Sequence, residues 1–72
     1  MKKIKKIKIK INGKYLTINE SLSLSIFIKQ LKIPLKKVAI ELNKEIVDKN
    51  KISKIKLKKN DKIEIVNFIG GG

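Results

Sequence analysis

The sequence predicts an α+β roll, in which a mixed β-sheet is covered on one face by a single helix. Isoleucine and lysine alternate with a period of two near the start of the chain, and alternation returns in its second half. Between these parts, one stretch changes to helical spacing. No linker or repeat divides the 72 residues, so we expect one domain over residues 1–69 and a flexible glycine tail over residues 70–72.

The first two strands are expected to form an antiparallel hairpin. Isoleucine alternates with lysine over residues 3–11, the pattern of a half-buried strand. Asn12-Gly13 follows, a dipeptide that suits a tight turn because both turn positions need positive φ. Residues 14–18 alternate again and form the returning strand. The side chains expected to face the core are Ile7, Ile9, Ile11, Leu16 and Ile18, whereas Tyr15 and Thr17 are expected to face outward.

A helix of about ten residues is expected next, too short to be stable alone and therefore packed on the sheet. Ser23 is its expected N-cap. The apolar positions that follow have the spacing i, i+3, i+4 and i+7, and they are Leu24, Phe27, Ile28 and Leu31. The helix should end before Pro34, because the residue before a proline avoids the α region.

The second half of the chain reads as three further strands joined by turns. Alternation predicts a strand from Lys37 to Leu42, then a turn at Asn43-Lys44 and a short strand from Glu45 to Val47. A lysine-rich crossover over residues 48–59 has three apolar anchors, Ile52, Ile55 and Leu57. Asn60-Asp61 turns the chain into the last strand, Lys62 to Ile69.

The composition argues against several classes of protein. The sequence has no cysteine and no histidine, which removes the usual thiolate nucleophile, the commonest general base and the commonest metal ligands. No apolar run approaches the roughly 20 residues that cross a bilayer, and no signal-peptide pattern follows Met1. We therefore expect a cytoplasmic protein that is not an enzyme by itself, has no metal site and makes no membrane contact.

The net charge of +13 raises the question of a nucleic-acid partner. All nineteen basic residues are lysine, however, and arginine is the usual residue for bidentate phosphate and guanine contacts. The lysines are spread along the chain, and one tyrosine and two phenylalanines give no obvious stacking platform. A solvated basic surface is the expected outcome, and a basic nucleic-acid-binding module remains the alternative.

The chain ends in Gly70-Gly71-Gly72, directly after an apolar strand-like run. Glycine passes through a channel too narrow for a Cβ and accepts almost any φ and ψ. Such a tail suits a carboxylate that is threaded into the active site of another protein. A glycine stub without a function is the alternative.

The second half of the chain resembles the ThiS family of thiamine-biosynthesis sulfur carriers, which have the ubiquitin-like β-grasp fold. The resemblance lies in VAIELNKEIV (residues 38–47), Leu57, NDKIEIV (residues 60–66) and FIGGG (residues 68–72). The sequence departs from the family at Asn60, where glycine is frequent, at Asp48-Lys49, where Pro-Arg is frequent, and at Ile52, where an aromatic residue is common.

The resemblance implies a carrier that acts through the Gly72 carboxylate. An E1-like adenylating enzyme of the ThiF type would use ATP to attach AMP to Gly72, so the carrier itself would bind no cofactor. A persulfide donor would then give a Gly72 thiocarboxylate, which supplies sulfur to thiazole synthase of the ThiG type. Gly70 and Gly71 would give the tail its reach.

Three questions stay open. Phe68 and Ile69 are candidates for contact with the partner, and closure of the core is the alternative for both. Asp61 and Glu64 either contact a basic partner surface or are simply solvated. Other β-grasp sulfur carriers, namely the small subunit of molybdopterin synthase and a carrier for tRNA thiolation, are the alternative functions.

Overall fold

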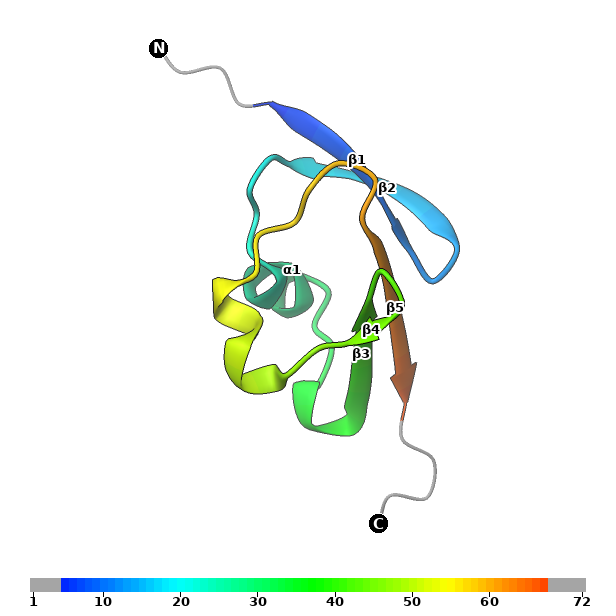
Figure 1. Ribbon diagram of the computed structural model, residues 1–72, viewed down its shortest axis with the longest axis vertical. Coiled ribbons are helices and arrows are strands. Elements are labelled where there is room, and N and C mark those ends of the chain that lie inside the picture. The colour runs from blue at the N-terminus through cyan, green and yellow to red at the C-terminus, as the bar shows by residue number, and fades with distance from the viewer. Residues whose placement is uncertain (1–4, 68–72) are drawn as a thin grey trace.

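Five strands form one mixed sheet in the order β2-β1-β5-β3-β4 (Figure 1). The computed structural model describes residues 5–67. The strands are β1 Lys6–Ile11, β2 Lys14–Asn19, β3 Val38–Leu42, β4 Glu45–Ile46 and β5 Lys62–Asn67. The neighbours β1 and β5 are parallel, and the other neighbouring pairs are antiparallel. This arrangement confirms the predicted mixed sheet.

The single α-helix, α1 (Leu24–Gln30), lies across one face of this sheet (Figure 1). Ser23 is its N-cap as predicted, and the Ser23 Oγ accepts a hydrogen bond of 3.1 Å from the backbone N–H of Ile26. The helix has seven residues and ends earlier than expected, because Lys32 takes a left-handed conformation with φ of 58°. Leu31 is consequently the C-cap and is 39% exposed, so its predicted place in the core was wrong.

The tight turns have the predicted conformations. Asn12 and Gly13 both have positive φ, as do Asn43 and Lys44, so each pair closes a two-residue hairpin. Asn60 also has positive φ, at 71°, which confirms that asparagine serves here in the place of glycine.

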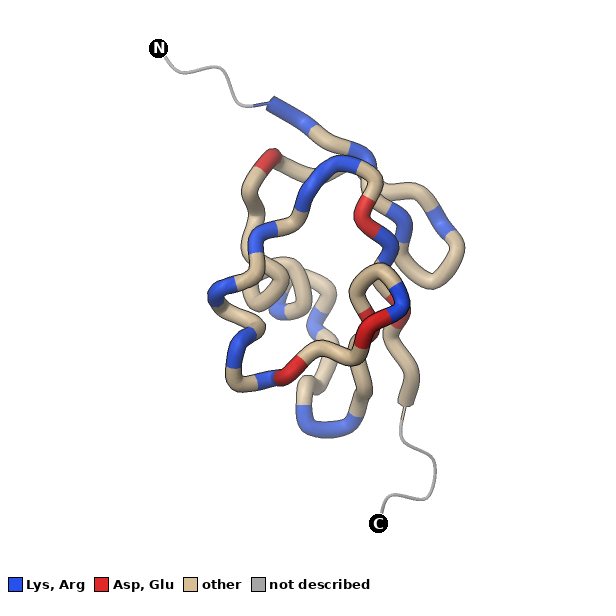
Figure 2. Tube along the Cα trace, viewed as in Figure 1, with Lys and Arg blue, Asp and Glu red and all other residues tan. Residues whose placement is uncertain are grey.

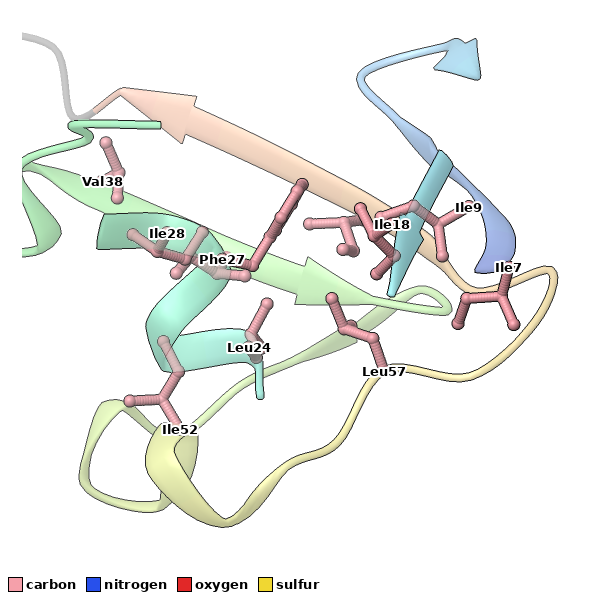
Figure 3. Close-up of a cluster of buried hydrophobic side chains, with 11 residues drawn as sticks. Ile7, Ile9, Ile18, Leu24, Phe27, Ile28, Val38, Ile52 and Leu57 are labelled. Atoms are coloured by element: carbon pink, nitrogen blue, oxygen red, sulfur yellow. The ribbon is translucent and has the colours of Figure 1, made fainter. Parts of the chain in front are cut away.

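Two connections contain 3₁₀ helices that the sequence pattern did not predict. A short 3₁₀ helix, η1 (Leu35–Lys37), precedes β3, and a longer one, η2 (Lys49–Lys54), follows β4. The Asp48 carboxylate caps η2 by accepting a hydrogen bond from the backbone N–H of Asn50 at 2.9 Å. Ile52 is the buried residue of η2 and anchors it in the core below α1 (Figure 3).

The core lies between α1, η2 and the covered face of the sheet (Figure 3). Its buried side chains are Ile7, Ile9, Ile18, Leu24, Phe27, Ile28, Val38, Ile40, Ile52, Leu57 and Ile63. Leu16 was expected among them but is 38% exposed. It pairs with buried Ile9 on the covered face, but β2 is an edge strand, and Leu16 there lines an open groove beside Leu31.

Candidate functional site: the end of strand β5 and the open face of the sheet

The predicted reactive tail is carried by β5. The residues expected to react, to give reach or to contact a partner are Phe68, Ile69, Gly70, Gly71 and Gly72, and all five lie outside the described residues. The structure describes β5 as far as Asn67, which pairs with Val38 at the start of β3. Asn67, the last described residue, therefore lies at the end of the sheet next to η1 (Figure 1).

The side chains that β5 turns toward the core become less buried toward this end. Ile63 is 1% exposed, Ile65 is half-buried against the core, and Asn67 is exposed. Val66, on the opposite face, is 53% exposed. The strand thus begins in the core and ends with side chains available to another molecule.

A buried carboxylate fixes the start of β5. Asp61 is 9% exposed, and its carboxylate accepts hydrogen bonds from the backbone N–H of Lys58 at 2.7 Å and from the Asn43 side-chain amide at 3.0 Å. The side-chain oxygen of Asn43, Oδ1, in turn accepts a hydrogen bond from the backbone N–H of Lys62 at 2.9 Å. Asp61 therefore ties two turns together, which answers the question left open by the sequence: it is a structural residue and not an exposed contact.

Asn12 holds the middle of β5. Strand β1 ends at Ile11, but the Asn12 backbone N–H donates to the Ile63 carbonyl at 2.9 Å, and the Asn12 Oδ1 accepts from the Ile65 N–H at 2.8 Å. These two bonds continue the support of β5 beyond the last residue of its parallel neighbour. No sequence signal pointed to this role, because 53 positions separate Asn12 from Ile65.

The face of the sheet opposite α1, called here the open face, carries an apolar patch near the end of β5. The patch consists of Ala39, Ile46 and Val66. Ala39 and Val66 are directly opposite each other in the register of β3 and β5, and Ile46 pairs with Glu41 on the far side of β3. Ile46 is 70% exposed and Val66 is 53% exposed. The two exposed side chains are on β4 and β5, which flank β3 with its half-buried Ala39, and an exposed apolar cluster of this kind is a candidate contact surface.

Two glutamates border this patch. Glu41 and Glu64 are direct partners in the register of β3 and β5, so both carboxylates stand on the open face. Like charges directly opposite each other on a sheet are mutually unfavourable. A cation supplied by another molecule would relieve this repulsion. Of the two acids that the sequence left open, Glu64 is the exposed one.

The described residues hold little chemistry of their own. Among residues 5–67, no group of three or more acidic, histidine or cysteine side chains could hold a metal ion. No helix in this part of the chain is long and apolar enough to cross a membrane. The candidate site therefore consists of the end of β5 and the exposed apolar patch on the open face.

Comparison with families and solved structures gives a consistent result. The model of the ThiS family matches residues 5–72, a range that includes the glycine run. The crystal structure of thiamine biosynthesis protein ThiS from Geobacter metallireducens is similar over 92% of this chain and 100% of that chain, with a TM-score of 0.82 and 30% identity. A solution structure of a thiamine biosynthesis protein from the same organism gives a TM-score of 0.71, again with 30% identity, over 92% of this chain and 88% of that one.

Two further relatives differ in length. The chain is 38% identical over 66 residues to a thiazole synthase of Paramagnetospirillum magneticum, which covers 92% of this chain and only 20% of the synthase. The chain thus spans about a fifth of that protein. It is also 32% identical over 68 residues to the uncharacterized protein ycf40 of Porphyra purpurea, covering 94% of this chain and 96% of that protein.

Proposed function

The chain belongs to the ThiS family, and from this premise we propose that it is a sulfur carrier in thiamine biosynthesis. The observation that carries the proposal is the match of the family model over residues 5–72, which includes both the β-grasp domain and the glycine run. In this role the chain is a carrier that enzymes act on, and not an enzyme. We place it in the cytoplasm, together with those enzymes.

The proposed chemistry is confined to the Gly72 carboxylate. An α-carboxylate has a pKa of about 3.3–3.7, so at neutral pH it is ionised and does not react with nucleophiles. An E1-like adenylating enzyme of the ThiF type therefore activates it: a carboxylate oxygen attacks the α-phosphate of ATP, and pyrophosphate leaves. The terminal sulfur of a persulfide then displaces AMP, and a thiol cleaves the resulting disulfide to leave the Gly72 thiocarboxylate.

In this proposal the adenylating enzyme recognises the carrier through its open face. The apolar patch of Ala39, Ile46 and Val66 lies beside the last described residues of β5, so a partner that binds the patch is next to the start of the tail. Glu41 and Glu64 favour a partner with a basic side chain at the same place. We propose that Phe68 and Ile69 extend this contact, and that Gly70 and Gly71 pass through the narrow approach to the adenylation site.

The proposed sulfur acceptor is thiazole synthase of the ThiG type. A thiazole synthase of Paramagnetospirillum magneticum contains a segment similar to this chain within one longer polypeptide. A carrier and the enzyme that takes its sulfur gain effective concentration when they share a chain, which supports this pairing over other acceptors.

The test is to make the thiocarboxylate and then to offer it to different acceptors. Incubation with ATP, an adenylating enzyme and a persulfide donor should raise the mass by the difference between sulfur and oxygen. Removal of Gly72, or addition of one residue after it, should abolish this mass change, and formation of the product on either variant would overturn the assignment. The loaded carrier should yield thiazole with thiazole synthase; transfer only to the large subunit of molybdopterin synthase, or only to a tRNA-thiolating enzyme, would support the alternative carriers instead.

A further inference from the structure

The open face is basic where β1 lies beside β2 and the start of β5, and the apolar patch lies toward the end of β5 and on β3 and β4. Lys8 and Lys10 alternate with the buried side chains of β1 and so point away from the core. Lys62 stands directly beside Lys10 in the parallel register of β1 and β5, and Tyr15 is the direct partner of Lys10 on β2.

These side chains surround a hollow of about 200 Å³, lined by Lys8, Ile9, Lys10, Tyr15, Asn60 and Lys62. The ammonium groups of Lys8 and Lys10 lie over the Tyr15 ring, 5.7 and 5.3 Å from its centroid. Tyr15 is nevertheless 70% exposed, so its ring remains accessible to a ligand. The Asn60 backbone N–H donates to the Lys8 carbonyl at 2.9 Å, which holds the crossover turn against this hollow.

A lysine-rich composition explains the number of lysines but not this placement. Lys10 and Lys62 are direct register partners, an arrangement that is unfavourable for the fold on its own. Of the two glutamates that the register places on the open face, Glu41 is on β3 and Glu64 is on β5 two positions after Lys62, and neither is among the residues that line the hollow. Figure 2 shows several acidic positions around β3 and β4, and Asp61, which precedes Lys62, is buried with its carboxylate bonded to Lys58 and Asn43. An anion at the hollow meets three ammonium groups without a competing acid in its lining.

We propose that this lysine–tyrosine site (Lys8, Lys10, Tyr15, Asn60 and Lys62) binds single-stranded nucleic acid. The ammonium groups contact phosphates, and a base stacks on Tyr15, the combination that single-strand-binding surfaces use. An acidic peptide would use the charges but leave the ring without a stacking partner. A membrane would need an exposed apolar group to insert, and Ile9, the one aliphatic residue of the lining, is 1% exposed. Because lysine is a point charge, the site is expected to have little base preference.

This binding goes beyond the proposed carrier function and is compatible with it. Lys62 and Asn67 are at opposite ends of β5, about 17 Å apart at the rise of an extended strand. A nucleic acid at the lysine–tyrosine site therefore leaves the apolar patch and the strand end open to an adenylating enzyme.

The experiment measures anisotropy of a labelled oligothymidylate with the full chain, as a function of salt. The triple variant K8Q/K10Q/K62Q is compared with K29Q/K51Q/K54Q, which removes the same charge from exposed lysines of α1 and η2. We expect the first triple to weaken binding about tenfold and to lower the slope of log K against log salt by about 2, since each single-strand contact contributes about 0.7. The second triple should leave that slope unchanged.

Variants of Tyr15 distinguish base stacking from electrostatic attraction. Tyr15→Ala should weaken oligonucleotide binding about fivefold or more, whereas Tyr15→Phe should not. Equal losses of affinity in the two triple lysine variants, or no effect of Tyr15→Ala, would overturn the proposal. Binding would then be a non-specific effect of the net charge. Polyacrylate and anionic vesicles serve as further probes, and equally strong binding of either would also overturn it. Thiocarboxylate formation on K8Q/K10Q/K62Q is expected to be unchanged, so failure of the carrier function would appear separately.

Discussion

Three asparagines, Asn12, Asn43 and Asn60, adopt positive φ angles. Asn12 and Asn43 bond to β5, and Asn60 lies in the turn that leads into it and bonds to Lys8 of β1. Asparagine tolerates the left-handed region better than most residues and also brings a side chain that hydrogen-bonds, which glycine lacks. The sequence predicted the turns from these residues. It could not predict the long-range bonds of Asn12 and Asn43, because these depend on which strands become neighbours.

The first prediction concerns the buried carboxylate of Asp61. Replacing Asp61 with Ala leaves the Lys58 N–H and the Asn43 amide without their acceptor, and should lower the free energy of unfolding by about 1–3 kcal/mol. Urea denaturation of the variant beside Glu64→Ala measures the effect. Glu64 is exposed, so its replacement should stay within about 0.5 kcal/mol of the parent. Equal losses for the two variants would mean that Asp61 does not hold the turns together.

At the scale of elements, β5 connects the core with the candidate site, and its gradient of burial predicts a gradient of stability. Ile63→Ala should cost about 2–5 kcal/mol, because Ile63 is fully enclosed. Ile65→Ala should cost less, since Ile65 is half-buried. Val66→Ala should change stability by no more than about 0.5 kcal/mol. Thermal melts of the three variants give the order, and a larger loss at Val66 than at Ile63 would contradict it.

The same replacements should affect recognition in the opposite order. Val66 belongs to the apolar patch, so Val66→Ala should weaken binding to the adenylating enzyme without unfolding the carrier. Ile63→Ala should reduce binding only in proportion to the fraction unfolded. A titration by calorimetry at a temperature where both variants are folded would measure this, and unchanged affinity of Val66→Ala would remove the patch from the interface.

Alternation and turn chemistry were enough to predict the five strands, the hairpins and the helix start. The two 3₁₀ helices were missed because η2 has Ile52 as its one buried residue, which leaves no apolar periodicity to detect. The early end of α1 was missed because Lys32 is not a residue type that usually takes positive φ. The residues that meet on the open face could not be predicted, because this needs the parallel register of β1 and β5, and no local pattern specifies which distant strands pair.

For the whole molecule, stability and function are expected to depend on different parts of the chain. The described core extends from Ile7 to Ile63, and the pairing of β5 with β3 is described as far as Asn67. The apolar alternation of the sequence ends at Ile69, so Gly71→Val should leave the free energy of unfolding within about 0.5 kcal/mol of the parent. The same change should sharply reduce adenylation, because a β-branched side chain is stiff and bulky where bare backbone is required. An early melt of Gly71→Val, or normal adenylation, would contradict this division.

The net charge of +13 gives a prediction about the molecule as a whole. Repulsion among the lysines opposes the compact state, and salt weakens it, since the screening length falls from about 30 Å at 0.01 M to about 3 Å at 1 M ionic strength. Unfolding free energy should therefore rise as sodium chloride is added, whereas a protein held together by surface ion pairs would lose stability. The K29Q/K51Q/K54Q variant removes three positive charges and should show a smaller rise. Urea denaturation at several sodium chloride concentrations tests both statements, and a stability that falls with salt, or an equal rise in the variant, would show that lysine repulsion does not govern the stability of this fold.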